Sequence, residues 1–587
     1  MKSGATHKQD TGHCFMNPPA QLQPFVGTLT LCLLFFRPSL ALALGRNSTS
    51  GVEDAAPSND TSSYSESYFT HPDHAGLIYA HILLMSACWV LVLPVAVVLS
   101  LAGSRLTLVS QYWFLALNAL GLVLGTIYNS KTPNLYPNNA HGKVGWLISW
   151  VASAQVLLSL MGCTGAIIRS HPSYSKPPIS GHLSSDLGTD RDRRLSSDSS
   201  QCTESQPKAA HLPPASSSRE GGDYEALTMH GFDEDQFAMA AQSSPGVSRL
   251  PGDKITFVRV WQNIGIIYQL IDRIILPLGF VALATGLATF GRLFEGKAIF
   301  SGLAHWIKGG VFFWLGLFTL GRWAGSFGEL GWAWNMPPTT FRRTWRPSAE
   351  WMESALIFVY GSTNIFLEHL GGWGGAWSAQ DLEHIAITIL FIGGGLCGML
   401  VESAKVRSLL NTTVLEATGD PRSEPNGEGQ LQRLDLSTYE FSLNPIPALV
   451  ILLLGIIMSS HQQSTGMSMD IHRQWGFLLS GASITRCLTY ILVFLRPPRS
   501  TLPSRPPTEL LTSFALIAGG IIFMASSSDT IKGMMYYNLD SMFLYTVTMG
   551  LAGLLMAWVV VVLSIKGWAS RREGRLGPRS CGLTRAL

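Results

Sequence analysis

The sequence predicts an all-α polytopic membrane protein with about eleven transmembrane helices, in an N-terminal three-helix module and a C-terminal eight-helix module. Of its 587 residues 47% are hydrophobic and only 13% are charged, whereas about 25% of the residues in soluble domains are charged. The apolar residues are gathered into long runs, and about 20 of them in a row are enough to cross a bilayer. The expected partner is therefore the lipid bilayer, and the net charge of +3 gives no indication of nucleic-acid binding.

The first 45 residues resemble a secretory signal. A polar leading region precedes an apolar run over 25–44 that ends in small residues, which is typical of a signal peptide; an uncleaved signal anchor is the alternative. Glycosylation sequons follow at Asn47 and Asn59. Together they predict that 46–74 is luminal and that the protein enters the secretory pathway (endoplasmic reticulum, Golgi, vacuole or plasma membrane). A mitochondrial membrane is the alternative location.

Each remaining segment can be assigned from its composition. Three apolar runs form the N-terminal module, 75–168, and eight form the C-terminal module, 255–568. The stretch 169–254 is rich in Ser, Pro, Asp and Arg and cannot bury a core, so we expect a disordered cytosolic loop. Just before the first run of the second module, 258–271 is expected to lie along the membrane interface. Glycine clusters in the runs 381–403 and 507–531 predict close helix packing.

The positions of the Lys and Arg residues predict how the protein is oriented in the membrane. With the sequons outside and about eleven spans, most Lys and Arg clusters fall inside, which agrees with the positive-inside rule. The basic tail, 569–587, carries five arginines and is expected in the cytosol. A further sequon at Asn411 then lies inside, so we expect it to stay unglycosylated.

Seven of the 15 histidines lie in or beside the spans, and this topology puts all seven at luminal ends. They are His81, His141, His305, His369, His384, His461 and His472. Histidines gather at membrane interfaces because their polar tips stay hydrated, but that tendency does not explain why one side is favoured. The set therefore predicts a functional surface on the luminal face.

The segment from Glu368 to His384 concentrates ligand-type side chains in one short turn between two apolar runs. Ionisable groups within a membrane are costly unless they are paired, hydrated or used. Imidazole and carboxylate groups suit a transition metal, so the predicted metal ligands are His305, Glu368, His369, Asp381, His384, His461 and His472. The alternative is a hydrogen-bonded polar cap on the bundle. No catalytic motif accompanies the set, so enzyme activity is left open.

A second candidate site lies in the N-terminal module. His81 and His141 fall on different helices at one expected membrane depth. Two imidazoles from facing helices are the arrangement that holds a b-type haem. The alternative is that each histidine is simply packed at the interface.

Several motifs resemble a known family. They lie at 304–310, 331–335, 361–369, 381–384 and 459–472. These stretches are similar to the Ytp-like family of fungal membrane proteins, and the similarity extends over nearly all spans but not over 169–254. The resemblance implies a fungal integral membrane protein whose biochemical activity is undefined.

The N-terminal module also resembles half of a cytochrome b-561 domain. The similarity rests on 81–85, Trp89 and Pro94, and on His141 in the third helix, but Asn118 stands where that family has a histidine. The resemblance implies that one luminal haem pair, His81 and His141, is kept and the second pair is lost. Electron transfer between two haems is therefore not expected.

The leading functional hypothesis is a luminal redox or metal-binding site on a membrane protein. A transporter or channel is the alternative from another class, and a non-catalytic membrane scaffold is the third. Arg486 is the most deeply placed charge in the spans and needs a partner. We expect Glu402 or Asp272 to supply it, either in a structural ion pair or along a substrate path.

Overall fold

The computed structural model describes residues 66–170, 252–296, 298–334, 347–369, 379–418, 443–497 and 502–576, and every secondary-structure element within these ranges is helical. Nine of the helices in these ranges are long and apolar enough to cross a membrane. The all-helical membrane fold is therefore confirmed, while the count of eleven spans is not. Asn47, Asn59 and most of the expected loop lie outside the described residues.

One group of helices forms the N-terminal bundle: α2 (Ala75–Ser86), the π-helix η1 (Ala87–Val92), α3 (Leu93–Leu101), α4 (Thr107–Lys131), α5 (His141–Ser170) and α7 (Gly252–Phe290). Its core contains Trp89, Phe114, Ile148 and, from α7, Ile275. Because α7 completes this core, the division into three and eight helices is not confirmed. The interfacial segment expected at 258–271 is instead part of one continuous helix of 39 residues.

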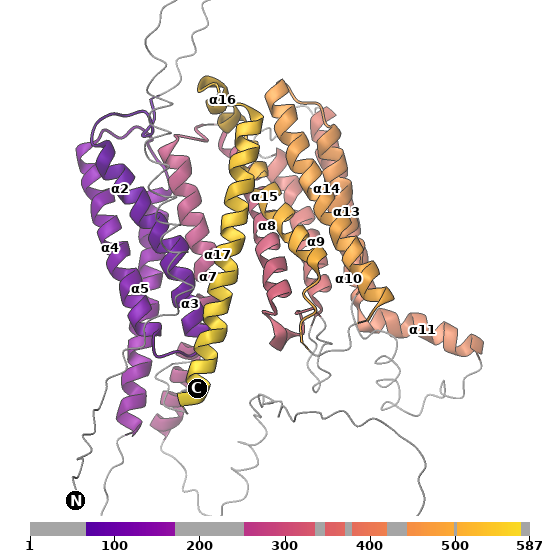
Figure 1. Ribbon diagram of the computed structural model, residues 1–587, viewed down its shortest axis with the longest axis horizontal. Coiled ribbons are helices and arrows are strands. Elements are labelled where there is room, and N and C mark those ends of the chain that lie inside the picture. Colours follow the sequence, from indigo (N-terminus) through magenta and orange to yellow (C-terminus); the bar gives the residue numbers. More distant parts are fainter. Residues whose placement is uncertain are drawn as a thin grey trace, which may run out of the picture.

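The first span changes its helix type in the middle. Pro94 has no backbone N–H, so the carbonyl of Val90, four residues earlier, loses its normal helical donor. The indole Nε1 of Trp558 donates to this oxygen at 2.8 Å. Trp558 belongs to α17 (Ser541–Leu576), which packs along α3. The last span of the chain therefore stabilises the break in the first, and Figure 1 shows α17 in yellow beside the indigo helices.

The remaining long helices form the C-terminal bundle: α8 (Ala298–Ala324), α9 (Ala349–His369), α10 (Ala379–Glu402), α13 (Ile446–Ser460), α14 (Gly466–Leu495) and α15 (Pro507–Ala525). The expected glycine packing is seen here. A Cβ on Gly520 would lie 2.6 Å from the backbone nitrogen of Phe313, and one on Gly395 would lie 2.5 Å from that of Phe358. These contacts bring α15 onto α8 and α10 onto α9.

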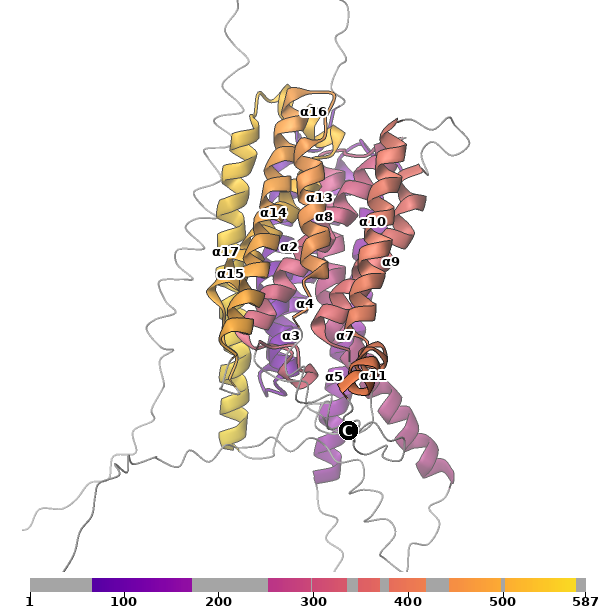
Figure 2. The same ribbon diagram turned by 90° about the vertical axis from the view of Figure 1, so that its right-hand side faces the viewer.

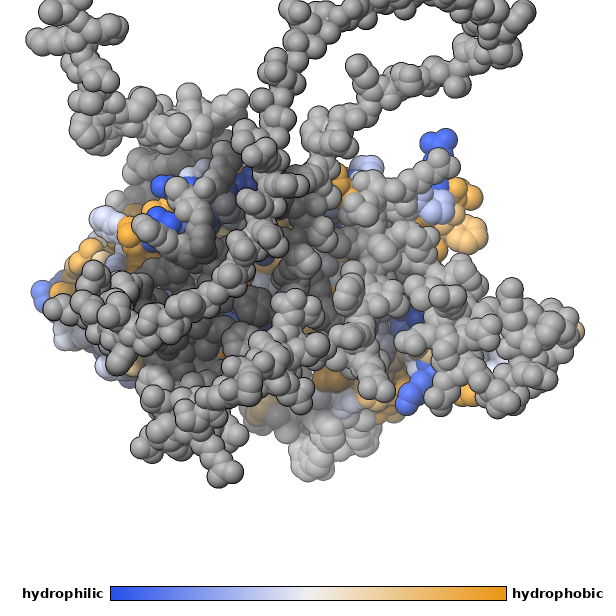
Figure 3. All heavy atoms as spheres, turned by 90° about the horizontal axis from the view of Figure 1, so that it is seen from below, coloured by the Kyte–Doolittle hydropathy of each residue, from blue (hydrophilic) through white to orange (hydrophobic). Residues whose placement is uncertain are grey.

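Two short helices lie at opposite ends of the bundle. Helix α11 (Ala404–Thr418) runs across the bundle axis at the end where the described chain stops, and α16 (Ser528–Tyr536) lies at the other end (Figures 1 and 2). In the view from below, hydrophilic side chains stand among hydrophobic ones around the edge of the described surface (Figure 3). We use the predicted topology to name the α16 end luminal and the α11 end cytosolic.

Candidate functional site: a histidine-lined cavity

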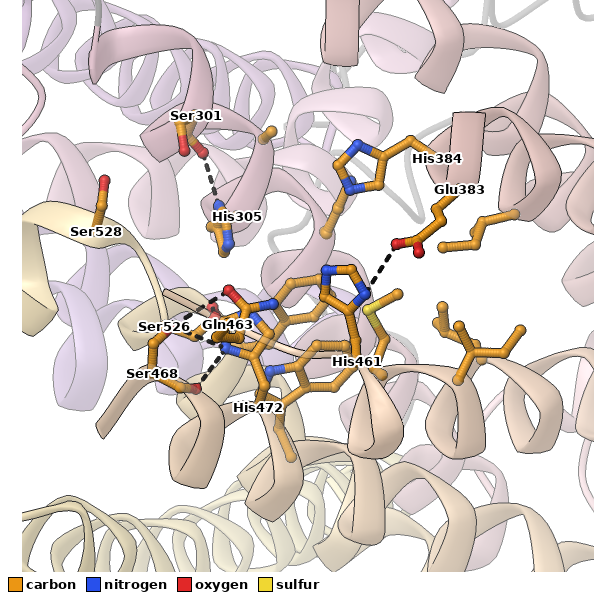
Figure 4. Close-up of a pocket in the computed structure, with 18 of the residues that line it drawn as sticks. Ser301, His305, Glu383, His384, His461, Gln463, Ser468, His472, Ser526 and Ser528 are labelled. Atoms are coloured by element: carbon orange, nitrogen blue, oxygen red, sulfur yellow. Dashed lines mark hydrogen bonds and ion pairs between the residues drawn. The ribbon is translucent and has the colours of Figure 1, made fainter. Parts of the chain in front are cut away.

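A cavity of about 840 Å³ opens at the luminal end of the C-terminal bundle. We call it the histidine cavity. Polar side chains line its mouth, and they are His305, Lys308, Glu383, His384, His461 and His472. Its deeper wall is apolar and includes Phe312, Tyr360, Phe391, Leu454, Trp475 and Phe523. Four of the seven predicted histidines therefore face one space, from helices that are far apart in the sequence (Figure 4).

Two of these imidazoles are held in a defined tautomer. His305 Nδ1 lies 2.8 Å from the carbonyl oxygen of Ser301, and His472 Nδ1 lies 2.7 Å from that of Ser468. A carbonyl oxygen only accepts hydrogen bonds, so each Nδ1 must carry the proton. In the neutral imidazole each Nε2 then keeps its lone pair. The two ring centroids are 6.2 Å apart.

The opposite side of the mouth contains a contact between His461, which follows α13, and Glu383 of α10. His461 Nδ1 lies 2.9 Å from Glu383 Oε2. Glu383 was not among the predicted ligands, although it adjoins His384 and shares the short segment that drew attention in the sequence. This pair joins the two helices at the mouth of the cavity (Figure 4).

The predicted metal set is only partly brought together. Within the side chains that the structure describes, no three His, Cys, Asp or Glu residues are grouped closely enough to hold a metal ion. Lys308 also lines the mouth, and its positive charge opposes a metal cation there. The side chains of Glu368, His369 and Asp381 lie outside the described residues, so their part in the prediction is untested.

Stacked aromatic rings lie beneath the cavity. The rings of Trp475 and Phe523 stack with centroids 4.0 Å apart and planes inclined by only 7°. Trp475 is fully buried, as is Leu479 one turn further along α14. Together with Leu516 they form an apolar layer that closes the cavity toward the cytosol.

Beyond that apolar layer lies a set of buried charges that we call the ionic layer: Arg322, Glu350, Glu353, Arg486 and Glu509. Arg322 pairs with Glu350 at 2.8 Å and with Glu353 at 3.3 Å. Arg486 reaches Glu353 at 3.2 Å and Glu509 at 2.8 Å. The contact with Glu509 is close but poorly aligned for a hydrogen bond, so the attraction is mainly electrostatic. Two arginines are thus shared among three glutamates.

The predicted partners of Arg486 were therefore wrong. Glu402 instead accepts a hydrogen bond from Ser348 at 2.7 Å, and Asp272 lies in the N-terminal bundle. The true partners are Glu353 on α9 and Glu509 on α15. The sequence locates a charge along its helix, but it does not say which neighbouring helix the side chain faces.

The two predicted histidines of the N-terminal bundle also lie close to each other. The rings of His81 and His141 have centroids 6.4 Å apart. His81 Nδ1 donates to the carbonyl oxygen of Gly121 at 2.7 Å, and His141 Nδ1 lies 3.3 Å from Thr285 Oγ1. Thr285 Oγ1 itself donates to the carbonyl of Ala282, so it accepts from His141. In their neutral form both imidazoles therefore keep the lone pair on Nε2.

Comparison with known proteins matches residues 278–567 to the family described as "Protein YTP1-like, C-terminal". An uncharacterised membrane protein of Schizosaccharomyces pombe is 32% identical over 86% of this chain and 96% of its own length. The chain belongs to the YTP1-like family. An uncharacterised membrane protein of Saccharomyces cerevisiae is 43% identical over 49% of this chain and 46% of its own length. The protein called YTP1 from the same yeast is 24% identical over 31% of each chain.

Residues 62–163 of this YTP1-like protein match a domain of unknown function. No solved structure matches the chain. The family membership confirms the expected Ytp-like resemblance, and the names of the two uncharacterised relatives describe membrane proteins without an activity. The likeness to cytochrome b-561 stays a prediction.

Proposed function

We propose that this YTP1-like protein is a membrane carrier that admits a small amphipathic solute into the histidine cavity from the luminal side. The observation that carries this proposal is a large cavity open at one end of a helix bundle and closed at the other by charges. The closed side retains a void of only about 20 Å³ beside Glu353, Arg486 and Ser483, which is about the space of one water molecule.

The lining of the cavity suggests the class of solute. Lys308 and the imidazoles at the mouth suit an acidic or hydrogen-bonding head group. The aromatic floor suits an apolar portion, because a ligand gains about 25 cal/mol for each Å² of apolar surface that it removes from water. A solute with one polar and one apolar end matches both regions.

Opening of the cavity toward the cytosol would require the ion pairs of the ionic layer to break. Polar side chains beside it, Ser483 and Thr512, line the small void and would solvate the charges as they part. Alternating access of this kind is commonly a rocking of one part of a bundle against another. In this scheme the described structure corresponds to the state open to the lumen.

Cysteine accessibility tests the proposal. Leu454→Cys lies deep in the cavity, and Ser483→Cys lies beside the ionic layer. We expect a membrane-impermeant thiol reagent to reach the first from the lumen and the second from the cytosol. Weakening the layer with Glu353→Gln should slow the luminal reaction and accelerate the cytosolic one.

The control is Ala552→Cys, which is fully buried between α15 and α17 and should stay unreactive in both backgrounds. If Ser483→Cys never reacts from the cytosol and Glu353→Gln leaves both rates unchanged, the carrier proposal fails. That result would favour the scaffold alternative.

A second candidate function, membrane redox, rests on the His81–His141 pair. Two imidazoles that donate through Nδ1 and direct Nε2 elsewhere are the donor set of a b-type haem, which would supply one-electron chemistry when bound. Gly125 and Gly286 lie directly beside the two rings, where a Cβ would come within 2.8 Å of His81 and 3.0 Å of His141. These glycines let α4 and α7 approach the imidazoles closely.

The absorption spectrum of the purified protein tests this second candidate. A haem signal that is lost in His81→Ala and kept in His305→Ala would support it. Colourless protein expressed in cells supplied with haem precursor would exclude it, and would leave the histidines as packed interfacial residues.

A further inference from the structure

Asp272 occupies an unusual position among the buried carboxylates. Within the described residues Glu350, Glu353, Glu509 and Glu573 are also buried, and each forms an ion pair with an arginine. Asp272 is only 2% exposed, yet it lies in the N-terminal bundle among neutral side chains. Its sequence neighbour Arg273 is exposed to the surroundings and acts on Asp272 only through its charge, without a contact between the two side chains among the described residues. A buried charge without a counter-charge is costly.

The groups around Asp272 form an ordered chain of hydrogen bonds. Asp272 Oδ2 accepts from Ser100 Oγ at 2.6 Å, and Asp272 Oδ1 accepts from the amide of Gln155. Since Ser100 donates to the carboxylate, it accepts from the Tyr268 hydroxyl at 2.8 Å. Gln111 Nε2 in turn donates to Tyr268 at 3.2 Å. Side chains of α3, α4, α5 and α7 therefore converge on one carboxylate.

One buried oxygen in this cluster accepts no hydrogen bond. Gln111 is 5% exposed, and its Oε1 is buried without a hydrogen-bond partner. Its amide nitrogen contacts Tyr268, so this oxygen also lies at the edge of the cluster. A buried polar atom without a partner costs about 1–3 kcal/mol, and an additional group in the cluster would remove that cost.

We propose that Asp272, Ser100, Tyr268 and Gln111 form a binding site for a small monovalent cation of the sodium class. Carboxylate, hydroxyl and amide oxygens are the ligands that hard cations prefer. One carboxylate balances one positive charge, so the set suits a monovalent ion. Both carboxylate oxygens accept hydrogen bonds, which stabilises the ionised form that a metal cation requires, while burial acts in the opposite direction.

The cluster is also close to a route of entry. Ser100 is the second-last residue of α3, so the site lies about one helical turn from the loop that follows this helix. That loop is cytosolic in the predicted topology, and a cation would arrive from that side. The site belongs to the N-terminal bundle and does not depend on the carrier proposal.

Thermal unfolding of the full-length protein in detergent tests the site. Melting temperatures are compared in sodium, potassium and choline chloride at equal ionic strength and pH. A ligand that binds the folded state stabilises it in proportion to the logarithm of its concentration above Kd. We expect the melting temperature to rise with sodium but not with choline, and radioactive sodium to bind at one equivalent per chain.

Asp272→Asn should abolish both sodium responses, and Gln111→Leu, which removes the unpartnered oxygen together with the amide nitrogen that donates to Tyr268, should weaken sodium binding at least tenfold. Ser149→Ala is the matched control, because Ser149 is a buried polar residue of the same bundle that hydrogen-bonds Asn118 instead. It should keep the wild-type response. A wild-type protein without a sodium effect, a sodium effect that survives Asp272→Asn, or a purely pH-dependent shift that is lost in Asp272→Asn would each overturn the proposal.

Discussion

Replacing Arg486 with Met should destabilise the protein strongly, because the substitution keeps an unbranched side-chain stem and removes the charged guanidinium. Arg486 is 5% exposed, and its guanidinium contacts Glu353 and Glu509 and donates to Thr319 Oγ1 at 3.0 Å. Without it, three buried carboxylates share Arg322 alone. Breaking a buried ion pair by removing one partner costs about 3–5 kcal/mol, and we expect a loss of that size.

A double-mutant cycle separates the ion pair from general damage to packing. Replacing both partners of a buried pair with apolar residues is often nearly neutral. Arg486→Met combined with Glu509→Leu should therefore recover about 2 kcal/mol relative to the sum of the single variants. The free energy of unfolding is measured by equilibrium denaturation in mixed micelles.

The matched control is Arg496→Met, the same substitution at an exposed position following α14. It should change the free energy of unfolding by no more than about 0.5 kcal/mol. The reasoning is refuted if Arg486→Met costs as little as this control, or if the double variant shows purely additive losses.

Three further outcomes are expected. Trp558→Phe leaves the Val90 carbonyl without its donor, and should cost about 1–3 kcal/mol in the same unfolding assay; a change below about 0.5 kcal/mol would contradict this. Gly520→Leu places side-chain atoms against the backbone of α8 and should cost about 1–3 kcal/mol or more, whereas Gly550→Leu, which has open space around it, should be tolerated. Asn411 should stay unglycosylated, so glycosidase treatment of an Asn47→Gln/Asn59→Gln double variant should leave its gel mobility unchanged; a mobility shift that Asn411→Gln removes would show that the cytosolic placement of α11 is wrong.

The gathering of histidines at one end of the bundle could be predicted because it depends only on where each span begins and ends. Helix ends follow from the apolar runs, and alternate spans point the same way. His305, His384, His461 and His472 were thus assigned to one end from the sequence, and they line one cavity in the structure. The close helix contact at Gly520 followed in the same way from local composition.

Pairings between distant helices could not be predicted in this way. Glu353 lies 133 positions before Arg486, and its contact depends on which faces of α9 and α14 meet. The cluster around Asp272 could not be predicted for the same reason. Ser100 and Gln155 are ordinary polar residues in the sequence, and only the packing of the helices brings them to Asp272. A search for every polar residue inside an apolar run would have flagged Gln111 and Asn118, both of which are buried.

The π-helix in the first span has a consequence for the angular alignment of the whole bundle. In a regular α-helix each residue turns by about 100°, so His81 and Ser100, nineteen residues apart, would point about 100° away from one another. The six residues of η1 turn by only about 82° each in π geometry, which removes roughly 110° and returns the two side chains to nearly the same azimuth. One wide turn therefore lets a single helix direct His81 toward His141 at one end and Ser100 toward Asp272 at the other.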